Sequence, residues 1–198
     1  MERTVIFVRN GETKDYVLTD LGGVQARCVA DYLNDMLTKN SVKLVNIYSS
    51  SDRHSINTAM CLVNKLGVPL NISESLHEYT TSDRKIDGIP VDVSFHNFKD
   101  RVHKVMGELK LKLDICPTSP IIVYTNALFI SYAMSSLTRT LEDMEHFNDK
   151  SFNIHIPNCS VSTIVYNQKT SGWTIGNISC VAHLGNNISD TVTDIALS

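Results

Sequence analysis

The sequence lacks the marks of several protein classes. No apolar run approaches the roughly eighteen residues that span a bilayer, and no positively charged start leads into an apolar stretch as in a signal peptide. Lys and Arg form no run, and the net charge of −3 argues against a nucleic-acid-binding face. The five cysteines contain no C-x-x-C pair, which argues against a disulfide framework or a zinc site. We therefore expect reduced thiols in the cytoplasm or nucleus, with no metal, cofactor, membrane or nucleic acid bound.

The size and composition are those of a globular protein. The chain has 198 residues, of which 42% are hydrophobic and 20% charged, so it can bury a sizeable core. No internal repeat, low-complexity segment or linker divides it. We expect a single domain over 1–198, in which the polar residues from about 187 to 198 form a loosely held tail.

Helical and strand patterns alternate along the chain. The predicted strands are 4–8, 43–50 and 120–124, the predicted helices are 18–37, 51–67, 95–113 and 127–137, and a closing hairpin is predicted over 159–179. This order predicts an α/β fold: a three-layer sandwich whose mostly parallel central sheet has helices on both faces. The functional site of such a sheet lies beyond the carboxyl ends of its strands. The segments Arg9–Thr13, Ser49–His54 and Thr125–Ala127 meet that description.

Several short motifs occur in a recognisable order. They are "RNGET" at 9–13, "LTDLGGVQA" at 18–26, "SSSDRHSINTA" at 49–59, "LHE" at 76–78 and "YTNA" at 124–127. The chain resembles the histidine phosphatase superfamily, whose fold is called phosphoglycerate mutase-like, over almost its whole length. That family has Arg-His-Gly-Glu-Thr in the first motif. The stretch from Thr13 to Leu18 is shorter than in many relatives, which have further phosphate contacts there.

The resemblance implies a phosphate pocket whose key positions are altered. In the family the first histidine attacks phosphorus, two arginines and a second histidine hold the phosphate oxygens, and a carboxylate commonly protonates the leaving group. The corresponding residues here are Arg9 for the first arginine, Asn10 for the nucleophile, His54 for the second arginine with Arg53 one residue too early, Glu78 for the carboxylate, and Asn126 for the second histidine, followed by Ala127 for a glycine.

These substitutions predict a pseudoenzyme. The lone pair of the Asn10 amide nitrogen is delocalised, so Asn10 cannot carry a phosphoryl group as imidazole does. His54 lacks the permanently charged, bidentate fork of an arginine. We expect a pseudophosphatase that acts as a protein-interaction or scaffolding module with a protein partner, and a homodimer is compatible with this role.

Other interpretations of the pocket stay open at this point. Arg9, Arg53, His54 and Asn126 could bind phosphate or a phosphopeptide without turnover. Alternatively, the altered residues could only pack, with Arg9 and Glu78 forming an ion pair. An enzyme with altered chemistry would need another nucleophile, and no cysteine lies in the three pocket segments. Asn10 could also be an engineered replacement of a natural histidine, but that leaves His54 and Asn126 unexplained.

Overall fold

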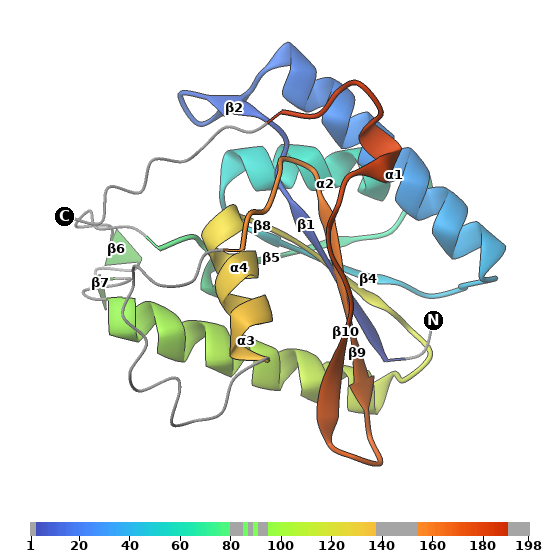
Figure 1. Ribbon diagram of the computed structural model, residues 1–198, viewed down its shortest axis with the longest axis vertical. Coiled ribbons are helices and arrows are strands. Elements are labelled where there is room, and N and C mark those ends of the chain that lie inside the picture. Colours follow the sequence, from blue (N-terminus) through green and yellow to red (C-terminus); the bar gives the residue numbers. More distant parts are fainter. Residues whose placement is uncertain (1–2, 80–84, 87–88, 91–94, 138–153, 190–198) are drawn as a thin grey trace.

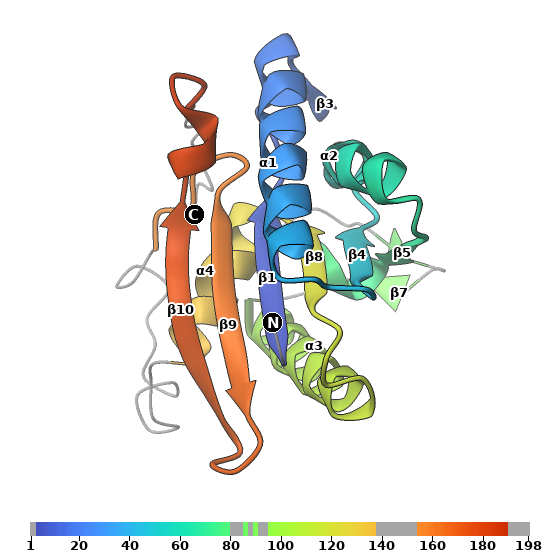
Figure 2. The same cartoon turned by 90° about the vertical axis from the view of Figure 1, so that its right-hand side faces the viewer.

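A six-stranded sheet lies at the centre of the computed structural model, which describes residues 3–79, 85–86, 89–90, 95–137 and 154–189 (Figure 1). Its strands in chain order are β1 (Thr4–Arg9), β4 (Asn46–Ser50), β5 (Leu70–Ser73), β8 (Ile121–Thr125), β9 (Val161–Asn167) and β10 (Gly172–Cys180). Figure 2 shows them in the spatial order β10-β9-β1-β8-β4-β5. The pairs β1–β8, β8–β4 and β4–β5 are parallel, whereas β9 is antiparallel to β1 and β10 to β9.

The helices cover both faces of this sheet. They are α1 (Asp20–Lys39), α2 (Arg53–Leu66), α3 (Phe95–Ile115) and α4 (Ala127–Ser136), with short 3₁₀ turns at Glu74–Leu76 and Ala182–Leu184. All four match predicted helices, and the predicted strands and closing hairpin are present. β4 begins at Asn46 rather than at residue 43. Not predicted were β5 and two small hairpins, β2 (Thr13–Lys14) with β3 (Val17–Leu18) and β6 (Lys85–Ile86) with β7 (Ile89–Pro90).

Alternate residues of β1 belong to two separate hydrophobic cores, one on each face of the sheet. Val5 and Phe7 of β1 pack with buried residues of α3 and α4, whereas Ile6 and Val8 pack with those of α1 and α2. Successive side chains of a strand point to opposite faces, so a strand buried on both sides reads as an unbroken apolar run. Figure 2 accordingly shows α1 and α4 on opposite sides of the sheet. The predicted three-layer α/β sandwich is confirmed.

The ends of the first two helices follow local chemistry. The Thr19 side chain caps α1 by accepting from the Gly22 N–H at 3.0 Å. Gly67 ends α2 in the left-handed conformation, with φ of 64°, which costs glycine little. Both features anchor helices that begin beside the carboxyl ends of β1 and β4.

Residues just before the C-terminus are hydrogen-bonded to α1. The Nε2 group of the buried Gln25 donates to the Asn187 carbonyl and to the Ser189 hydroxyl, both at 2.8 Å, so these two residues supply the partners that a buried amide needs. The loosely held tail expected from about residue 187 stays a prediction. The remainder of that tail lies outside the described residues. Among the described helices, none is both long and apolar enough to cross a bilayer.

Candidate functional site

The three segments predicted to meet do so at the carboxyl ends of neighbouring strands. β1 and β8 pair up to Arg9 and Thr125, and the next residue, Asn10, donates its backbone N–H to the Thr125 carbonyl at 3.1 Å. Asn126 then occupies the N-cap position of α4, which begins at Ala127, without a side-chain cap hydrogen bond. β8 lies between β1 and β4 in the sheet, and the turn after β4 leads into α2. Strand pairing thus fixes the spacing of side chains that are far apart in sequence.

A cavity of about 300 Å³ opens between these segments. Five of the six predicted site residues line it: Arg9, Asn10, His54, Glu78 and Asn126. The sixth, Arg53, is the exposed first residue of α2 and is not part of the wall. One residue of helix turns a side chain by about 100°, so His54 faces inward and Arg53 outward. Further described wall residues are Thr13, Asp15, Tyr16 and Ala127.

The small β2–β3 hairpin forms the mouth of the cavity. Its two-residue turn consists of Asp15 and Tyr16, whose φ values are 50° and 61°. Positive φ at both central residues is what a type I′ turn requires. Asn-Gly or Asp-Gly would have signalled this turn, and Asp-Tyr does not, so the hairpin escaped prediction. It places a carboxylate and an 83% exposed aromatic ring at the entrance.

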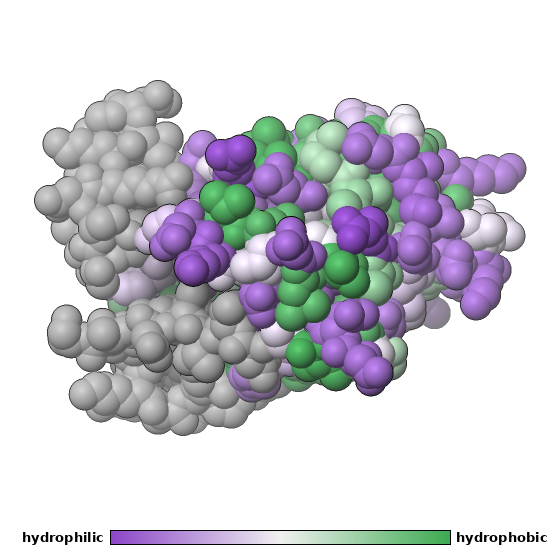
Figure 3. Space-filling view, turned by 90° about the horizontal axis from the view of Figure 1, so that it is seen from above, coloured by the Kyte–Doolittle hydropathy of each residue, from purple (hydrophilic) through white to green (hydrophobic). Residues whose placement is uncertain are grey.

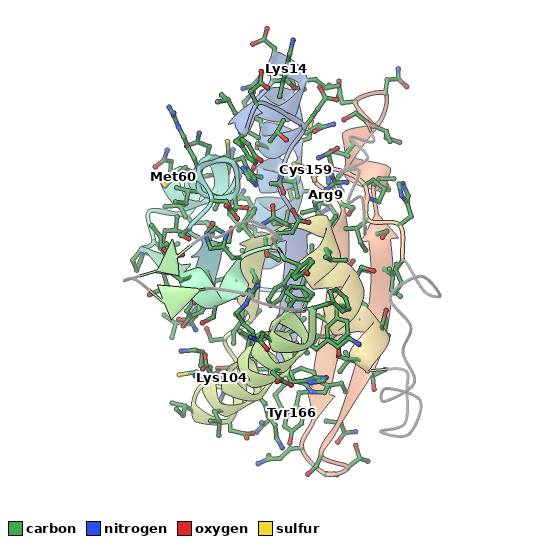
Figure 4. All side chains as sticks on the ribbon, turned by 90° about the vertical axis from the view of Figure 1, so that its left-hand side faces the viewer. Arg9, Lys14, Met60, Lys104, Cys159 and Tyr166 are labelled. Atoms are coloured by element: carbon green, nitrogen blue, oxygen red, sulfur yellow. The ribbon has the colours of Figure 1, made fainter. Side chains whose placement is uncertain are left out.

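Arg9 and Asn10 are both buried, at 5% exposure each. The Arg9 Nη1 donates to the Ile156 carbonyl at 2.6 Å. The Asn10 Nδ2 donates to the Gly11 carbonyl at 2.9 Å, which uses one of the two N–H groups of this amide, and Asn10 lines the cavity. Figure 4 shows Arg9 next to Cys159, whose N–H donates to the Asn10 carbonyl at 3.2 Å.

A chain of hydrogen bonds runs from the cavity wall into the protein. His54 Nε2 lies 2.9 Å from Asn126 Oδ1, and Asn126 Nδ2 donates to Asp52 Oδ2 at 2.9 Å. A carboxylate only accepts, so Asp52 fixes the Asn126 amide with its oxygen toward His54. His54 therefore donates from Nε2, and its Nδ1 is the nitrogen that can accept when the ring is neutral.

The same carboxylate holds a second histidine. His77 Nδ1 lies 2.8 Å from Asp52 Oδ2, and its side chain is only 3% exposed. On the other edge of the ring, Nε2 lies 2.6 Å from the Ser51 hydroxyl and 3.2 Å from Glu74 Oε2. We name Asp52, His77 and Asn126 the carboxylate network. Neither Asp52 nor His77 was predicted as part of a site, because no spacing links them in sequence.

The two inner carboxylates are perturbed in opposite directions. Burial acts to raise the pKa of Asp52, but the hydrogen bond and charge of His77, the hydrogen bond of Asn126 and the charge of His54 outweigh it, so this pKa lies below its ordinary value. For Glu78, burial dominates and raises the pKa, although the Leu128 N–H, Arg9 and His54 act against it. The environment thus favours a charged Asp52 and penalises a charged Glu78.

The sequence left open an ion pair of Glu78 with Arg9, and the charge of Arg9 acts to lower the pKa of Glu78. Glu78 Oε1 accepts the Leu128 N–H in the first turn of α4, at 3.2 Å. The helix dipole favours a carboxylate at this position.

Residues of the motifs at 9–13 and 18–26 hydrogen-bond to each other and join the loop after β1 to α1. The Glu12 backbone N–H donates to Gln25 Oε1, and the Thr19 hydroxyl donates to Glu12 Oε1, both at 2.8 Å. Thr19 in turn accepts from Gly22. These residues hold the loop after β1 in place, and none of the three hydrogen bonds faces the cavity. Their role in this structure is positional.

Cys159 lies beside the site but is shielded from reagents. It is fully buried, and burial raises the pKa of its thiol. Cys116 is exposed. We expect a thiol reagent at about pH 8 to label Cys116 rapidly, while Cys159 reacts only after unfolding, because the thiolate is the reactive form. Peptide mass spectrometry of wild type and Cys116→Ser checks this, and rapid labelling of Cys159 in the folded variant would contradict it.

Comparison with known proteins agrees with this architecture. Residues 7–85 match the model of the histidine phosphatase superfamily (branch 1). A mycobacterial glucosyl-3-phosphoglycerate phosphatase superposes with a TM-score of 0.68 at 17% identity, covering 91% of this chain and 100% of that one. The fold is that of the histidine phosphatase superfamily. A search of curated proteins gave no match.

Two further structures with the histidine phosphatase fold show the same likeness. Bacillus stearothermophilus YhfR has a TM-score of 0.67 at 17% identity, covering 91% of this chain and 98% of that chain. Phosphoserine phosphatase from Entamoeba histolytica, in complex with 3-phosphoglyceric acid, has a TM-score of 0.66 at 18% identity with the same coverage. At these identities the likeness establishes the fold.

In this chain the histidine phosphatase fold encloses a cavity with little positive charge. Among the described wall residues, Arg9 is the one permanent cation, whereas Asp15 and Glu78 carry carboxylates. A transferring phosphoryl group spreads negative charge over three oxygens and needs several fixed cations or N–H donors. Here one side-chain N–H of Asn10 donates to the Gly11 carbonyl and one of Asn126 donates to Asp52, so at most one N–H of each amide is left for a ligand.

Proposed function

We propose that this chain is a catalytically inactive protein with the histidine phosphatase fold, which serves as a protein-interaction or scaffolding module. The observation that carries the proposal is Asn10 at the end of β1, buried and hydrogen-bonded through its nitrogen to Gly11. This is the position where the superfamily resemblance implies the attacking imidazole. An amide nitrogen has no available lone pair, so the phosphohistidine route has no acceptor there.

The remaining phosphate ligands implied by the resemblance are altered as well. His54 and Asn126 satisfy each other across 2.9 Å, and the exposed Arg53 cannot take the place of the second arginine. In an enzyme with a covalent intermediate, loss of the nucleophile alone can cost about 10⁶-fold in rate. The loss of a second cation adds to this. The substitutions therefore support absence of turnover rather than a slower enzyme.

The framework supports a role that depends on the folded shape. The hydrogen bonds joining Glu12, Thr19 and Gln25 keep the loop after β1 ordered without contributing to the cavity. Retention of such a scaffold around a pocket that lacks its nucleophile is what an interaction module requires. A homodimer is one form that such a module can take.

The decisive experiment is a hydrolysis assay. We expect no release of phosphate from p-nitrophenyl phosphate, 3-phosphoglycerate or phosphoserine above the buffer blank. We also expect the triple variant Asn10→His, His54→Arg, Asn126→His to gain measurable turnover. The double variant that keeps His54 should stay far below the triple variant, because it lacks the second guanidinium clamp.

Arg9→Ala is the matched control in the assay. Turnover of the wild-type protein that disappears in Arg9→Ala would contradict the proposal, because it would place catalysis in this cavity. A phosphorylated protein intermediate trapped from the wild type would contradict it equally.

A second candidate function is anion binding without turnover, favoured by the presence of Arg9 in the cavity wall. Calorimetry with inorganic phosphate, sulfate and a phosphopeptide at millimolar concentration distinguishes an anion-binding module from a scaffolding module that binds no anion. Heat that is abolished in Arg9→Ala would support this second function. Absence of heat would leave the scaffolding module without an anion ligand.

A further inference from the structure

The two edges of the central sheet, which Figure 2 shows on opposite sides, differ in how they are protected. β10 is irregular, because its register with β9 shifts on both sides of Asn177, and such bulges twist an edge away from further pairing. β5, with the sequence Leu-Asn-Ile-Ser, has no charge and no proline, and it pairs with β4 in unbroken register. Within the described part of the chain, no strand pairs with its other side. Such an edge can accept a further strand.

A groove of about 280 Å³ lies beside this edge, between β5 and α3. Its walls include Tyr48 and Ile72 of the sheet and Glu108 and Lys112 of α3. The Lys112 ammonium lies 5.1 Å from the centre of the Tyr48 ring, a distance at which the ring attracts the cation. The groove therefore combines apolar surface with one charge of each sign.

The helix side of the groove continues into an exposed stripe of α3. Glu108, Leu111, Lys112 and Ile115 are all exposed, and their spacing of three and four residues places them on one face of the helix. We name these four residues the α3 stripe. Leu111 and Ile115 are 63% and 79% exposed, and Ile72 of β5 is 56% exposed. Large aliphatic side chains left in water on two neighbouring elements indicate a surface that is covered in an assembly.

We propose that this edge is a dimer interface, in which β5 pairs antiparallel with β5 of a second copy of the chain. The inference rests on the proposed interaction role and names the partner. A two-fold axis perpendicular to the sheet, passing between Asn71 and Ile72, would join the two central sheets into one continuous sheet. The same axis keeps α3 of both copies on one face, where the α3 stripes flank the new strand pair.

The charges of the α3 stripe favour a second copy as the occupant. Glu108 and Lys112 lie about one helical turn apart. Because the two α3 helices run antiparallel about the axis, Glu108 of each chain faces Lys112 of the other. The groove is thus complementary to itself, as the interface of a two-fold dimer must be. A strongly acidic or basic partner would gain nothing from it, because its two charges cancel.

The surface around the β2–β3 hairpin is less suited to such an assembly. Figure 3 looks onto the end of the molecule that carries β2, where hydrophilic and hydrophobic residues are interspersed over the described surface. At the edge of β5, backbone N–H and C=O groups fix both the direction and the register of a strand that adds to it. The sheet edge is therefore the more specific of the two surfaces.

The test is sedimentation of the full chain between about 1 and 200 μM. We expect a reversible monomer–dimer equilibrium with a Kd on the order of 10 μM, because a short strand and one helix face make a small interface. Ile72→Lys places a charge on the edge and should leave the chain monomeric over this range. Val17→Lys replaces an aliphatic residue of similar exposure, 47%, on β3 and should leave the Kd unchanged. Thermal unfolding followed by circular dichroism verifies that both variants fold.

Charge reversal tests the pairing of the two α3 stripes directly. Glu108→Lys would set lysines opposite each other at both contacts, and Lys112→Glu would set glutamates opposite each other. Each variant alone should therefore dimerise at least about 10-fold more weakly than wild type. An equimolar mixture of the two variants should regain the wild-type affinity as a heterodimer, because every lysine then faces a glutamate. Pairing within one chain cannot give this rescue, since each variant chain carries charges of one sign at these positions.

Several outcomes would overturn the dimer interface. They are a wild-type chain that stays monomeric at about 200 μM, an unchanged Kd in Ile72→Lys, equal weakening in Val17→Lys, and charge variants that dimerise no better mixed than alone. The proposed function has a separate readout: phosphatase turnover would refute it whatever the sedimentation gives. Absence of turnover together with a monomeric wild type would refute the dimer interface alone.

Discussion

Replacing Gly22 by alanine is expected to destabilise the protein by about 3 kcal/mol or more. Gly22 lies in the first turn of α1, and a β-carbon there would overlap the Glu12 backbone carbonyl. The obstacle is main chain, fixed at the same point by a hydrogen bond from the Thr19 N–H at 3.0 Å. Neither α1 nor the loop after β1 can move without breaking the contacts that position Asn10. Guanidinium unfolding curves measure the loss.

The neighbouring glycine provides a matched control. At Gly23 the nearest atom to an added β-carbon is Nη1 of the flexible Arg27 side chain, at 3.7 Å. Alanine is the better helix former by roughly 0.5–1 kcal/mol, so Gly23→Ala should be neutral or stabilising. Equal stabilities of the Gly22→Ala and Gly23→Ala variants would show that the close approach of Glu12 to α1 is not rigid.

Replacing Asp52 by asparagine is expected to cost about 1–2 kcal/mol at neutral pH. Asp52 Oδ2 accepts from both His77 and Asn126. An asparagine oxygen in the same place can still accept both hydrogen bonds, so the substitution removes the negative charge that strengthens them. His77 is almost fully buried, so water does not compensate for the weaker hydrogen bond. Asp35→Asn on exposed α1 removes the same charge and should cost little.

The contribution of Asp52 should depend on pH in a defined direction. The pKa of Asp52 is lowered in the folded protein, so its carboxylate stabilises the fold fully above the unfolded-state value of about 3.9. That contribution is lost as the pH falls toward the lower folded-state pKa. The difference in unfolding free energy between wild type and Asp52→Asn should be constant between about pH 5 and 7 and shrink below about pH 4. A difference that grows on acidification would contradict this.

Local patterns were sufficient for the regular elements of the fold. The apolar run of β1 and the periodicity, cap and C-terminal glycine of α1 and α2 are properties of short stretches, and the structure agrees with each. The strands that were missed are short. β5 has only four residues, half of them exposed, and the β2–β3 hairpin turns at Asp15 and Tyr16 without glycine. Such elements depend on their neighbours rather than on propensity.

Some residues of the candidate site could be predicted from the motifs, and others are found only in the structure. Motif positions alone placed Arg9, Asn10, His54, Glu78 and Asn126 around one cavity, because each lies at or shortly after the carboxyl end of a parallel strand. Arg53 was wrongly included, since adjacent helical residues face different directions. The carboxylate network was not foreseen. Its residues come from three segments, and only the pairing of β4 with β8 brings Asn126 beside Asp52.

The sequence by itself determined the fold class, the strand ends that build the cavity, and the chemical identity of Asn10. Those follow from short-range patterning and from the side chain itself. The tertiary structure alone decided which way the Asn126 amide points, which side chains hydrogen-bond to each other within the wall, and which residues line the cavity. Hydrogen-bond direction depends on partners that are distant in the chain, and no local pattern encodes it.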